Sequence, residues 1–274
     1  MDLNTVRAVT RPRGRKDLEA FAPGDAWLAG GTWLFSEPQP HLKRLIDLAE
    51  MGWKPLSVDD TGLSIAATCT IAMLDAFEPP APWVAAKLIG QCCRSFVASF
   101  KIWNTATVGG NLCLALPAGP MVSLTVAMES VCVIWTPDGG ERHVPVLDFV
   151  RAPLQSSLRS GELLRGINVP LEALTRRTAF RRISLSPLGR SGVLLIGTLA
   201  TGGRFTLSVT ASTRRPVRLV FSGIPEISEL EERLDVEIPS DLYYDDVHGR
   251  PDWRRHMTFE FATEIRNELA EAGA

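Results

Sequence analysis

Two glycine-rich segments carry backbone groups that could bind an anion. The segment 30–32 (GGT) follows the apolar run AWLA at 26–29, and the segment 109–111 (GGN) follows TATV at 105–108, so we expect each glycine pair where a strand ends. Glycine suits positions where φ is positive or where a ligand approaches the backbone closely, and exposed N–H groups at such a turn form a concave anion site. Two such turns could grip one diphosphate from both sides.

Each glycine pair alone is equally typical of an ordinary tight turn. Neither segment has the G-x-G-x-x-G pattern of a dinucleotide fold or the G-x-x-x-x-G-K-S/T pattern of a phosphate loop. The residues therefore predict a phosphate site without naming its ligand.

The sequence lacks the residue sets used for nucleophilic, acid–base or metal chemistry. There is no G-x-S-x-G segment, and the histidines are scattered at positions 41, 143, 248 and 256. The five cysteines form no C-x-x-C pair, and the adjacent pair Cys92-Cys93 is expected inside a buried helix. We therefore predict no catalytic side chain, no metal ion and no iron–sulfur cluster on this chain.

Strand and helix patterns are interleaved over the first 170 residues. Short apolar runs bounded by Gly, Pro or Asp predict strands, and apolar positions recurring every three to four residues predict helices. We expect strands at 26–31, 44–48, 62–70 and 130–136. We expect helices at 70–77, 82–98 and 117–128, and a hairpin turn at 138–140.

From about residue 171 the sequence becomes basic and rich in strand patterns. Four apolar segments are spaced like an antiparallel meander, at 179–185, 191–200, 204–211 and 215–224. The tail at 251–274 predicts a helix with one apolar face, formed by Trp253, Met257, Phe261 and Ile265. We therefore place a domain boundary near residue 170, which gives domains 1–170 and 171–274.

Composition argues against two classes of partner. The 274 residues include 29 Lys and Arg against 31 Asp and Glu, a formal net charge of -2, which leaves no basic footprint for nucleic acid. No run of about 18 apolar residues occurs, and the polar N-terminus lacks the apolar core of a secretory signal. We therefore expect a cytoplasmic protein without a membrane span.

Four segments together resemble a known family. In this order and spacing they are similar to the FAD-binding medium subunit of molybdenum hydroxylases, such as xanthine and carbon monoxide dehydrogenases. The segments are AGGTWL at 29–34, VASFKIWNTATVGGNLCLALPAGPM at 97–121, SGELLRGINVP at 160–170 and DDVHGRPDWRRHM at 245–257. The resemblance covers nearly the whole chain.

The fold that the resemblance implies is α+β. It has a two-part, PCMH-type FAD-binding domain with a small N-terminal α/β part and a larger central α+β part. A C-terminal antiparallel sheet of three to four strands with helices follows. This agrees with the change of character near residue 170.

The resemblance also implies which residues hold FAD. The cofactor is bound noncovalently, with its diphosphate between the two glycine turns. The matching positions are Ala29, Gly30, Gly31, Thr32, Trp33, Leu34, Thr107, Val108, Gly109, Gly110 and Asn111. Leu164 matches an apolar residue on the flavin side, and Arg182 stands where the family usually has a lysine near the cofactor. A cation at Arg182 could stabilise negative charge on the reduced flavin, or the side chain could be a solvated strand residue.

Three positions depart from the family pattern. Trp33 and Pro120 stand where the family commonly has aspartate, and Trp103 stands in place of an arginine. The second aspartate usually helps to fix the nucleotide part of FAD, so its loss predicts weaker polar anchoring. Trp33 and Trp103 could stack on adenine or flavin, but packing beneath the loops or at a subunit contact is favoured because aromatic side chains bury large areas. We expect Asn111 to fix the turn that follows it.

The function implied by the resemblance is electron transfer. In such complexes a large subunit oxidises the substrate at molybdopterin, and electrons pass through two [2Fe-2S] clusters of a small subunit to the FAD of the medium subunit. That FAD reduces NAD, oxygen or another acceptor, and the assembly is commonly a dimer of heterotrimers. Two alternatives are an assembly module that has lost FAD, motivated by Trp33, Trp103 and Pro120, and a self-contained FAD oxidase.

Overall fold

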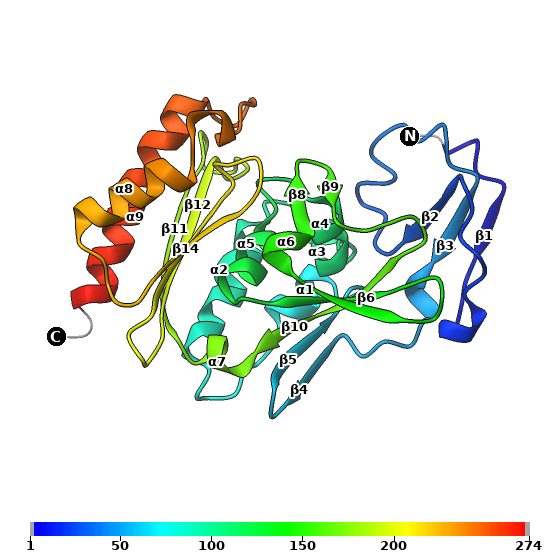
Figure 1. The fold of residues 1–274 in the computed structure, drawn as a ribbon. Helices are drawn as coiled ribbons and strands as arrows, with labels where there is room; N and C mark the ends of the chain where they lie inside the picture. The colour runs from blue at the N-terminus through cyan, green and yellow to red at the C-terminus, as the bar shows by residue number, and fades with distance from the viewer. Residues whose placement is uncertain (1–2, 272–274) are drawn as a thin grey trace.

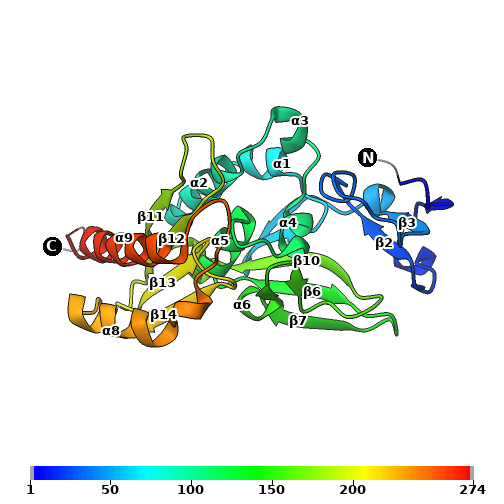
Figure 2. The ribbon, with the colours of Figure 1, turned by 90° about the horizontal axis from the view of Figure 1, so that it is seen from above.

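Three larger sheets lie in a row in the computed structural model, which describes residues 3–271 (Figures 1 and 2). The N-terminal sheet lies at one end, the central sheet with most of the short helices lies in the middle, and the C-terminal sheet with two long helices lies at the other end. The predicted α+β class with a C-terminal antiparallel sheet is confirmed.

The N-terminal sheet is small and parallel. Its strands run in the order β1-β3-β2, and they are β1 (Ala8–Thr10), β2 (Asp25–Leu28) and β3 (Arg44–Asp47). Single 3-10 turns, η1 (Arg15–Asp17) and η2 (Leu48–Glu50), flank the strands. Leu45 and Ile46 on β3 are buried, because β3 is the middle strand. The strands predicted near 26–31 and 44–48 are confirmed.

The central sheet is antiparallel and has the order β4-β5-β10-β6-β7. Its strands are β4 (Leu56–Asp59), β5 (Gly62–Ala66), β6 (Val131–Trp135), β7 (Glu141–Pro145) and β10 (Leu163–Pro170). The predicted hairpin joins β6 and β7, where Gly139 has φ of +86° and Asp138 Oδ1 accepts a hydrogen bond from Gly140 N at 3.1 Å. This turn chemistry is the kind that the Asp-Gly pair predicted.

Short helices surround the central sheet. They are α1 (Ile71–Asp75), η3 (Val84–Ala86), α2 (Lys87–Ser95), α3 (Phe100–Trp103), α4 (Val108–Leu114), α5 (Pro120–Ala127), α6 (Val146–Phe149) and α7 (Leu171–Leu174). A small hairpin, β8 (Val150–Ala152) and β9 (Gln155–Ser156), follows α6. The helices predicted near 70–77, 82–98 and 117–128 are confirmed, and Cys92 and Cys93 are buried in α2 as expected.

One local prediction is wrong at the second glycine segment. Gly109 and Gly110 do not follow a strand but lie in the first turn of α4. Thr107 is the N-cap of this helix, and its hydroxyl accepts a hydrogen bond from Gly110 N at 3.0 Å. A side chain that caps the first turn stabilises a helix start that the glycines by themselves disfavour.

The C-terminal sheet is the predicted antiparallel meander. Its strands, in order, are β11 (Arg177–Ile183), β12 (Val193–Leu199), β13 (Phe205–Thr210) and β14 (Val217–Phe221). Two helices cover one face, α8 (Ile227–Glu237) and α9 (Pro251–Glu271), while a short turn, η4 (Ser240–Leu242), joins them. Phe261 and Ile265 of α9 are buried against the sheet, as their spacing predicted. Residues 272–274 of the predicted helix lie outside the described residues.

The second face of the C-terminal sheet packs on α5. Alternate residues of β12 point to opposite sides, so Val193 and Leu195 join the core under α8 and α9. Leu194 and Ile196 join the core of the central part instead. The division of the chain into domains at residue 170 stays a prediction, and the buried cluster around α5 extends across that position.

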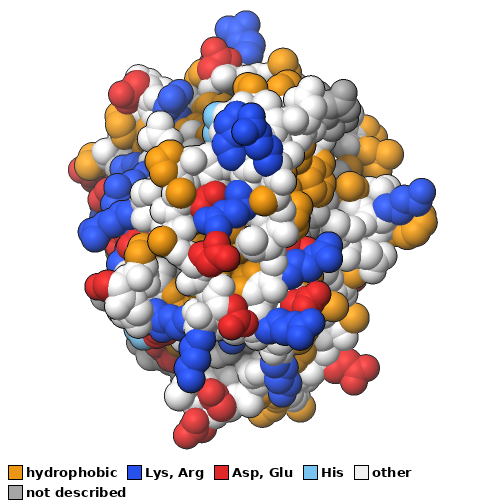
Figure 3. Space-filling model, turned by 90° about the vertical axis from the view of Figure 1, so that its right-hand side faces the viewer, with side chains coloured by type: hydrophobic (Ala, Val, Ile, Leu, Met, Phe, Trp, Pro, Cys, Tyr) orange, Lys and Arg blue, Asp and Glu red, His pale blue; other side chains and the backbone are white. Residues whose placement is uncertain are grey.

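The surface at the N-terminal end carries mixed charge. Figure 3 shows Lys and Arg side chains intermingled with Asp and Glu on this face. Several are paired across the small sheet and its turns, such as Arg11 with Asp47 and Arg13 with Glu50, each at 3.0 Å. Within residues 3–271, no helix combines the length and the apolar character needed to cross a membrane.

Candidate FAD-binding site

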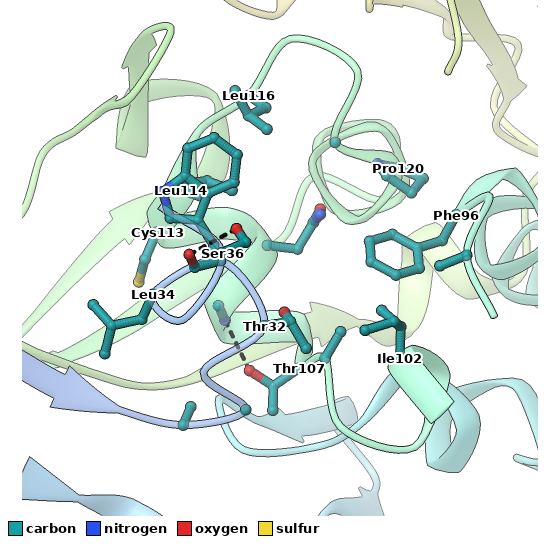
Figure 4. A pocket seen from close by; sticks show the side chains of 18 of the residues that line it. Thr32, Leu34, Ser36, Phe96, Ile102, Thr107, Cys113, Leu114, Leu116 and Pro120 are labelled. Carbon is teal, nitrogen blue, oxygen red and sulfur yellow. Dashed lines mark hydrogen bonds between the residues drawn. The ribbon is translucent and has the colours of Figure 1, made fainter. Parts of the chain in front are cut away.

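A cavity of about 660 Å³ lies where the turn after β2 meets α4 and the segments around it. Leu34, Leu114 and Leu116 lie on one side of the cavity, and Phe96, Ile102 and Pro120 lie on the opposite side (Figure 4). A volume of this size is typical of small-molecule and cofactor sites, which measure about 300–1,000 Å³. The walls that face each other are largely apolar.

The structure brings most of the predicted site residues together around this cavity. Those that line it are Ala29, Gly30, Gly31, Thr32, Trp33, Leu34, Thr107, Gly110 and Asn111. The two glycine segments, about 80 residues apart in sequence, therefore meet at one cavity. Val108, Gly109, Leu164 and Arg182 lie outside its lining.

The first glycine turn presents free backbone donors. Among the described residues, no hydrogen-bond acceptor is found for the N–H groups of residues 30–34. Gly31 has φ of +68°, and a Cβ on Gly30 would overlap the Thr105 carbonyl oxygen, so this path of the chain requires both glycines. Successive free N–H groups in such a turn form a concave site for an anion.

The second glycine segment works differently from the first. The N–H of Val108 donates to Cys69 O at 2.8 Å and the N–H of Gly109 donates to Ala67 O at 3.0 Å, while Gly110 N is bound by the Thr107 hydroxyl. These donors are therefore used within the chain. The expectation that both turns offer free N–H groups holds for the first turn alone.

The two glycines of α4 have separate roles. A Cβ on Gly109 would lie 2.5 Å from the Ala67 Cβ, so this glycine allows α4 to pack against the chain after β5. A Cβ on Gly110 would meet only the Thr107 hydroxyl, at 2.9 Å, and Gly110 lines the cavity. Gly110 therefore keeps the cavity wall free of a side chain.

Polar groups in the lining are few. Among the described residues, Glu37 and Arg190 are the charged side chains that line the cavity. Asn111 Oδ1 accepts a hydrogen bond from Met121 N at 3.1 Å, so this side chain links α4 to the first turn of α5. Pro120 begins α5 and is buried in the wall, so a ring stands where the resemblance implies a carboxylate.

The one thiol in the described lining is protonated at neutral pH. Cys113 lies beside Leu34 (Figure 4), and burial raises the pKa of its thiol to about 12. A protonated thiol is a weak nucleophile. The cavity is therefore suited to holding a ligand rather than attacking it.

Three predicted residues outside the lining, Leu164, Val108 and Arg182, make contacts within the protein. Leu164 on β10 and Val108 on α4 are buried in the central core. Arg182 is half-buried, and its guanidinium donates to Ser191 Oγ at 2.8 Å and to Gly189 O at 2.5 Å. Because residues 189 and 191 flank Arg190, Arg182 holds the loop that brings Arg190 to the cavity. Burial lowers the pKa of the Arg182 guanidinium.

The two tryptophans near the glycine turns have different surroundings. Trp103 packs against the central core, and its indole N–H donates to Phe96 O at 2.9 Å. Trp103 therefore supports the segment between α2 and α3, as the packing interpretation predicts. Trp33 lines the cavity.

Several lining residues were not predicted individually. Val97, Ile102, Cys113, Leu114 and Leu116 fall inside the segment 97–121 that carried the resemblance, so the segment itself contained their signal. Ser95 and Phe96 just precede it. Arg190 lies on the loop between β11 and β12 and has no pattern that marks it, because its place at the cavity depends on the fold.

A comparison with protein families identifies the family of the chain. The model of the FAD binding domain in molybdopterin dehydrogenase matches residues 16–172, which is more than half of the chain and includes both glycine segments. The chain belongs to this family. The matched residues include the lining of the cavity except for Arg190.

Relatives of known function match over part of the FAD-binding chain. Caffeine dehydrogenase subunit beta of Pseudomonas sp. (strain CBB1) is 28% identical over 186 residues, which is 65% of this chain and 61% of that relative. Xanthine dehydrogenase 1 of Arabidopsis thaliana is 27% identical over 172 residues, which is 56% of this chain and 12% of that much longer protein. The match thus spans about three fifths of the caffeine dehydrogenase subunit.

Solved structures match over the whole chain. A chain of quinoline 2-oxidoreductase from Pseudomonas putida 86 superposes with a TM-score of 0.80 at 18% identity, covering 99% of both chains. A chain of reconstituted CO dehydrogenase from Oligotropha carboxidovorans gives 0.80 at 19% identity, covering 100% of both. At such identities the likeness shows a common fold, including the C-terminal sheet that the family model does not cover.

Proposed function

We propose that this chain is the FAD-carrying electron-transfer subunit of a multi-subunit molybdopterin-dependent dehydrogenase. A large partner oxidises the substrate at molybdopterin, and a small partner with [2Fe-2S] clusters delivers electrons to the FAD of this chain. NAD, oxygen or another acceptor then receives them. Membership of the FAD-binding family and full-length likeness to chains of two such oxidoreductases support this proposal.

The observation that carries the proposal is the row of free donors at residues 30–34. The residues that carry these N–H groups line a cavity of about 660 Å³, so the groups are suited to hold the FAD diphosphate. Gly110 leaves the opposite wall without a side chain, so a ligand can approach the backbone closely. The apolar walls suit the ring systems of FAD, and Arg190 supplies a positive charge at the lining.

The residues of the chain bind and orient the cofactor rather than react. FAD, when bound, supplies the redox chemistry that no side chain provides. The Cys113 thiol, protonated at neutral pH, is a weak nucleophile toward the bound cofactor. The proposal therefore assigns no catalytic acid or base to this chain.

The flavin content of the purified complex tests the proposal. Co-expressed with its large and small partners, the chain is expected to hold FAD, which denaturation releases and fluorescence distinguishes from the absorbance of the [2Fe-2S] clusters. A complex that releases no flavin and takes up no added FAD would overturn the proposal. It would favour an assembly module, for which Pro120 in the cavity wall and the engaged donors of α4 are the structural arguments.

The isolated chain provides a second test. If it binds FAD but oxidises no small organic substrate, electron delivery by a partner is supported. Steady turnover by the isolated chain would instead identify a self-contained oxidase.

A further inference from the structure

Arg165 lies at a bulge in β10, beside the contact between the N-terminal and central parts. β10 pairs with β6 through Leu164 opposite Ile134 and Gly166 opposite Val133, so Arg165 has no partner residue on β6. A bulge of this kind redirects the side chain of the extra residue. Bulges commonly occur where a strand positions a functional segment.

The Arg165 side chain is held by aromatic faces. Its guanidinium carbon lies 4.4 Å from the ring centroid of Trp53 and 5.8 Å from that of Trp135, and the two indoles meet edge to face at 5.5 Å. A cation is attracted to the face of an indole ring. Among the described residues, the guanidinium has no hydrogen-bond or ion-pair partner, so these stacking contacts are its principal attachments.

Trp53 connects this arginine to the N-terminal part. It lies three residues after the end of η2, and it packs in a small core with Leu48 and Met51. Leu163 and Trp135 of the central sheet belong to the same small core. The N-terminal sheet has three short strands, and this core joins it to the central sheet together with the hydrogen bond from Trp27 Nε1 to Glu162 O at 2.9 Å and the stacking of Arg15 on Trp135 at 4.6 Å.

The Arg165 backbone is linked to the second glycine segment. Its carbonyl oxygen accepts a hydrogen bond from Ala67 N at 3.1 Å, and Ala67 O in turn accepts one from Gly109 N at 3.0 Å. Two hydrogen bonds therefore separate Arg165 from α4. The Arg165 side chain contacts Trp53, which packs on the N-terminal part of the chain, and that part contains the first glycine turn.

We propose that Arg165 is a positioning residue that fixes the glycine turn at 30–34 relative to α4. Its backbone supports one wall of the cavity, and its side chain clamps the N-terminal part that provides the opposite donors. The effect on FAD rests on the proposed function, whereas the effect on the turn at 30–34 does not. Side-chain variants leave the backbone hydrogen bond to Ala67 in place, so they test the clamp separately.

Hydrogen exchange of the full-length chain tests the clamp. In Arg165→Met, exchange of the hydrogen-bonded amides in a peptide covering 26–36, those of β2, Phe35 and Ser36, is expected to become about tenfold faster, while a peptide covering 193–210 is unchanged. The dissociation constant for added FAD is expected to rise by a similar factor. Arg165→Lys is expected to recover only part of both effects, because an ammonium lacks the planar face that stacks on indole.

Two further variants make the outcome decisive. Arg233→Met removes a comparable contact in the C-terminal part, where the guanidinium lies 5.4 Å from the Phe221 ring, and is expected to leave 26–36 unchanged. Trp53→Phe keeps a ring, so it folds even if Arg165→Met does not, and is expected to give a smaller increase at 26–36.

The proposal is wrong if Arg165→Met leaves exchange at 26–36 unchanged, or if it accelerates 26–36 and 193–210 equally. In the case that Arg165→Met does not fold, unchanged exchange at 26–36 in Trp53→Phe has the same meaning. A wild-type chain that binds no FAD refutes the proposed function, yet the exchange data still decide the role of Arg165.

Discussion

The two glycines of α4 have different roles, because Gly110 lines the cavity and Gly109 packs against Ala67. Gly110→Val is expected to abolish FAD retention, because the branched side chain occupies the wall of the cavity. The fold is expected to survive, with about 1 kcal/mol lost where the Thr107 cap is disturbed. Flavin absorbance after gel filtration, together with circular dichroism, measures both effects. Full flavin occupancy in this variant would show that the cofactor lies elsewhere.

Gly109→Val is the matched control for Gly110→Val. Its side chain meets Ala67 instead of the cavity, so loss of folded protein is expected before any selective effect on FAD. Overpacking of this kind costs about 1–3 kcal/mol. The adjacent glycines look equivalent in sequence, but Gly109 leaves room for Ala67 and Gly110 leaves room in the cavity.

Pro120 is the second residue whose role a substitution can reveal. Pro120→Asp places a carboxylate at the first position of α5 and in the cavity wall. A helix start favours negative charge, but a buried carboxylate without a partner is destabilising. We expect a lower melting temperature without FAD and about tenfold tighter FAD binding, which titration by flavin fluorescence measures. Unchanged affinity would show that position 120 does not contact the cofactor.

The cavity residues could be predicted from the sequence only where a motif contained them. The two glycine pairs were predicted from backbone geometry, and their neighbours in 29–34 and 107–111 were predicted from the family resemblance. Arg190 could not be predicted, because Arg182, Ser191 and Gly189 determine where its loop lies and those contacts depend on the folded sheet. The residue types also did not show that the N–H groups at the start of α4 donate to acceptors within the chain.

Among elements, the small parallel sheet contains an ion pair whose contribution to stability depends on pH. Asp25 on β2 and Arg44 on β3 stand opposite each other and form two contacts, at 3.0 and 2.6 Å. The hydrogen bond from Arg44 lowers the pKa of Asp25, whose side chain is 5% exposed. A carboxyl with a depressed folded pKa contributes stability that is present above its unfolded pKa, about 3.9, and is lost as pH falls through the folded pKa.

Asp25→Asn is therefore expected to remove about 2 kcal/mol of stability at pH 7, the value of a charged hydrogen bond. The difference between the variant and the wild type is expected to shrink below pH 4. Urea unfolding at pH 7, 5 and 3 measures this dependence. A difference that stays constant down to pH 3 would show that the pair contributes through shape rather than charge.

The start of α9 holds together the ends of two loops. Arg254, 1% exposed, donates to Gly249 O at 2.9 Å and to Gly192 O at 2.7 Å, and it also contacts Ala211 O and Asp246. The segment 245–257, which carried part of the family resemblance, therefore has a structural role. It anchors the end of the loop that brings Arg190 to the cavity.

Arg254→Met is expected to destabilise the chain by about 3–5 kcal/mol, because it leaves Asp246 and three carbonyl groups without a buried partner. Its neighbour provides a matched control. Arg255 pairs with Asp235 at the surface, so Arg255→Met is expected to cost no more than about 1 kcal/mol. Equal losses in the two variants, measured by chemical unfolding, would contradict this assignment.

Helices and strands were predicted correctly where the apolar pattern extended over many residues. They were missed where contacts between distant segments determine the local structure. β11 to β14 and α9 bury residues at the spacing read from the sequence. α4 has seven residues, two of them glycine, and it forms because Thr107 caps it and Gly109 packs on Ala67. α8 was not predicted because Leu230 and Leu234 are its only buried residues. Parallel pairing of β1 and β2 with β3 depends on contacts between distant segments.

At the scale of the whole molecule, the cavity belongs to the junction of two parts rather than to either one. The N-terminal part provides the free donors at 30–34, and the central part provides α4 and the walls. The C-terminal sheet reaches the cavity through Arg190 and shares a core with α5. A ligand bound there contacts all three parts, so its binding free energy stabilises their arrangement.

FAD is therefore expected to stabilise the chain as a whole by mass action. At a free concentration one hundred times the dissociation constant, a ligand specific to the folded state contributes about 2.7 kcal/mol. For a chain of this length the melting temperature is expected to rise by about 5–10 °C, since 1 kcal/mol corresponds to roughly 2–4 °C. The rise should grow with the logarithm of FAD concentration, and calorimetry of the isolated chain measures it. Gly110→Val is expected to show no rise, because its cavity is closed to the ligand. A rise of equal size in that variant would show that FAD stabilises the chain from a different site.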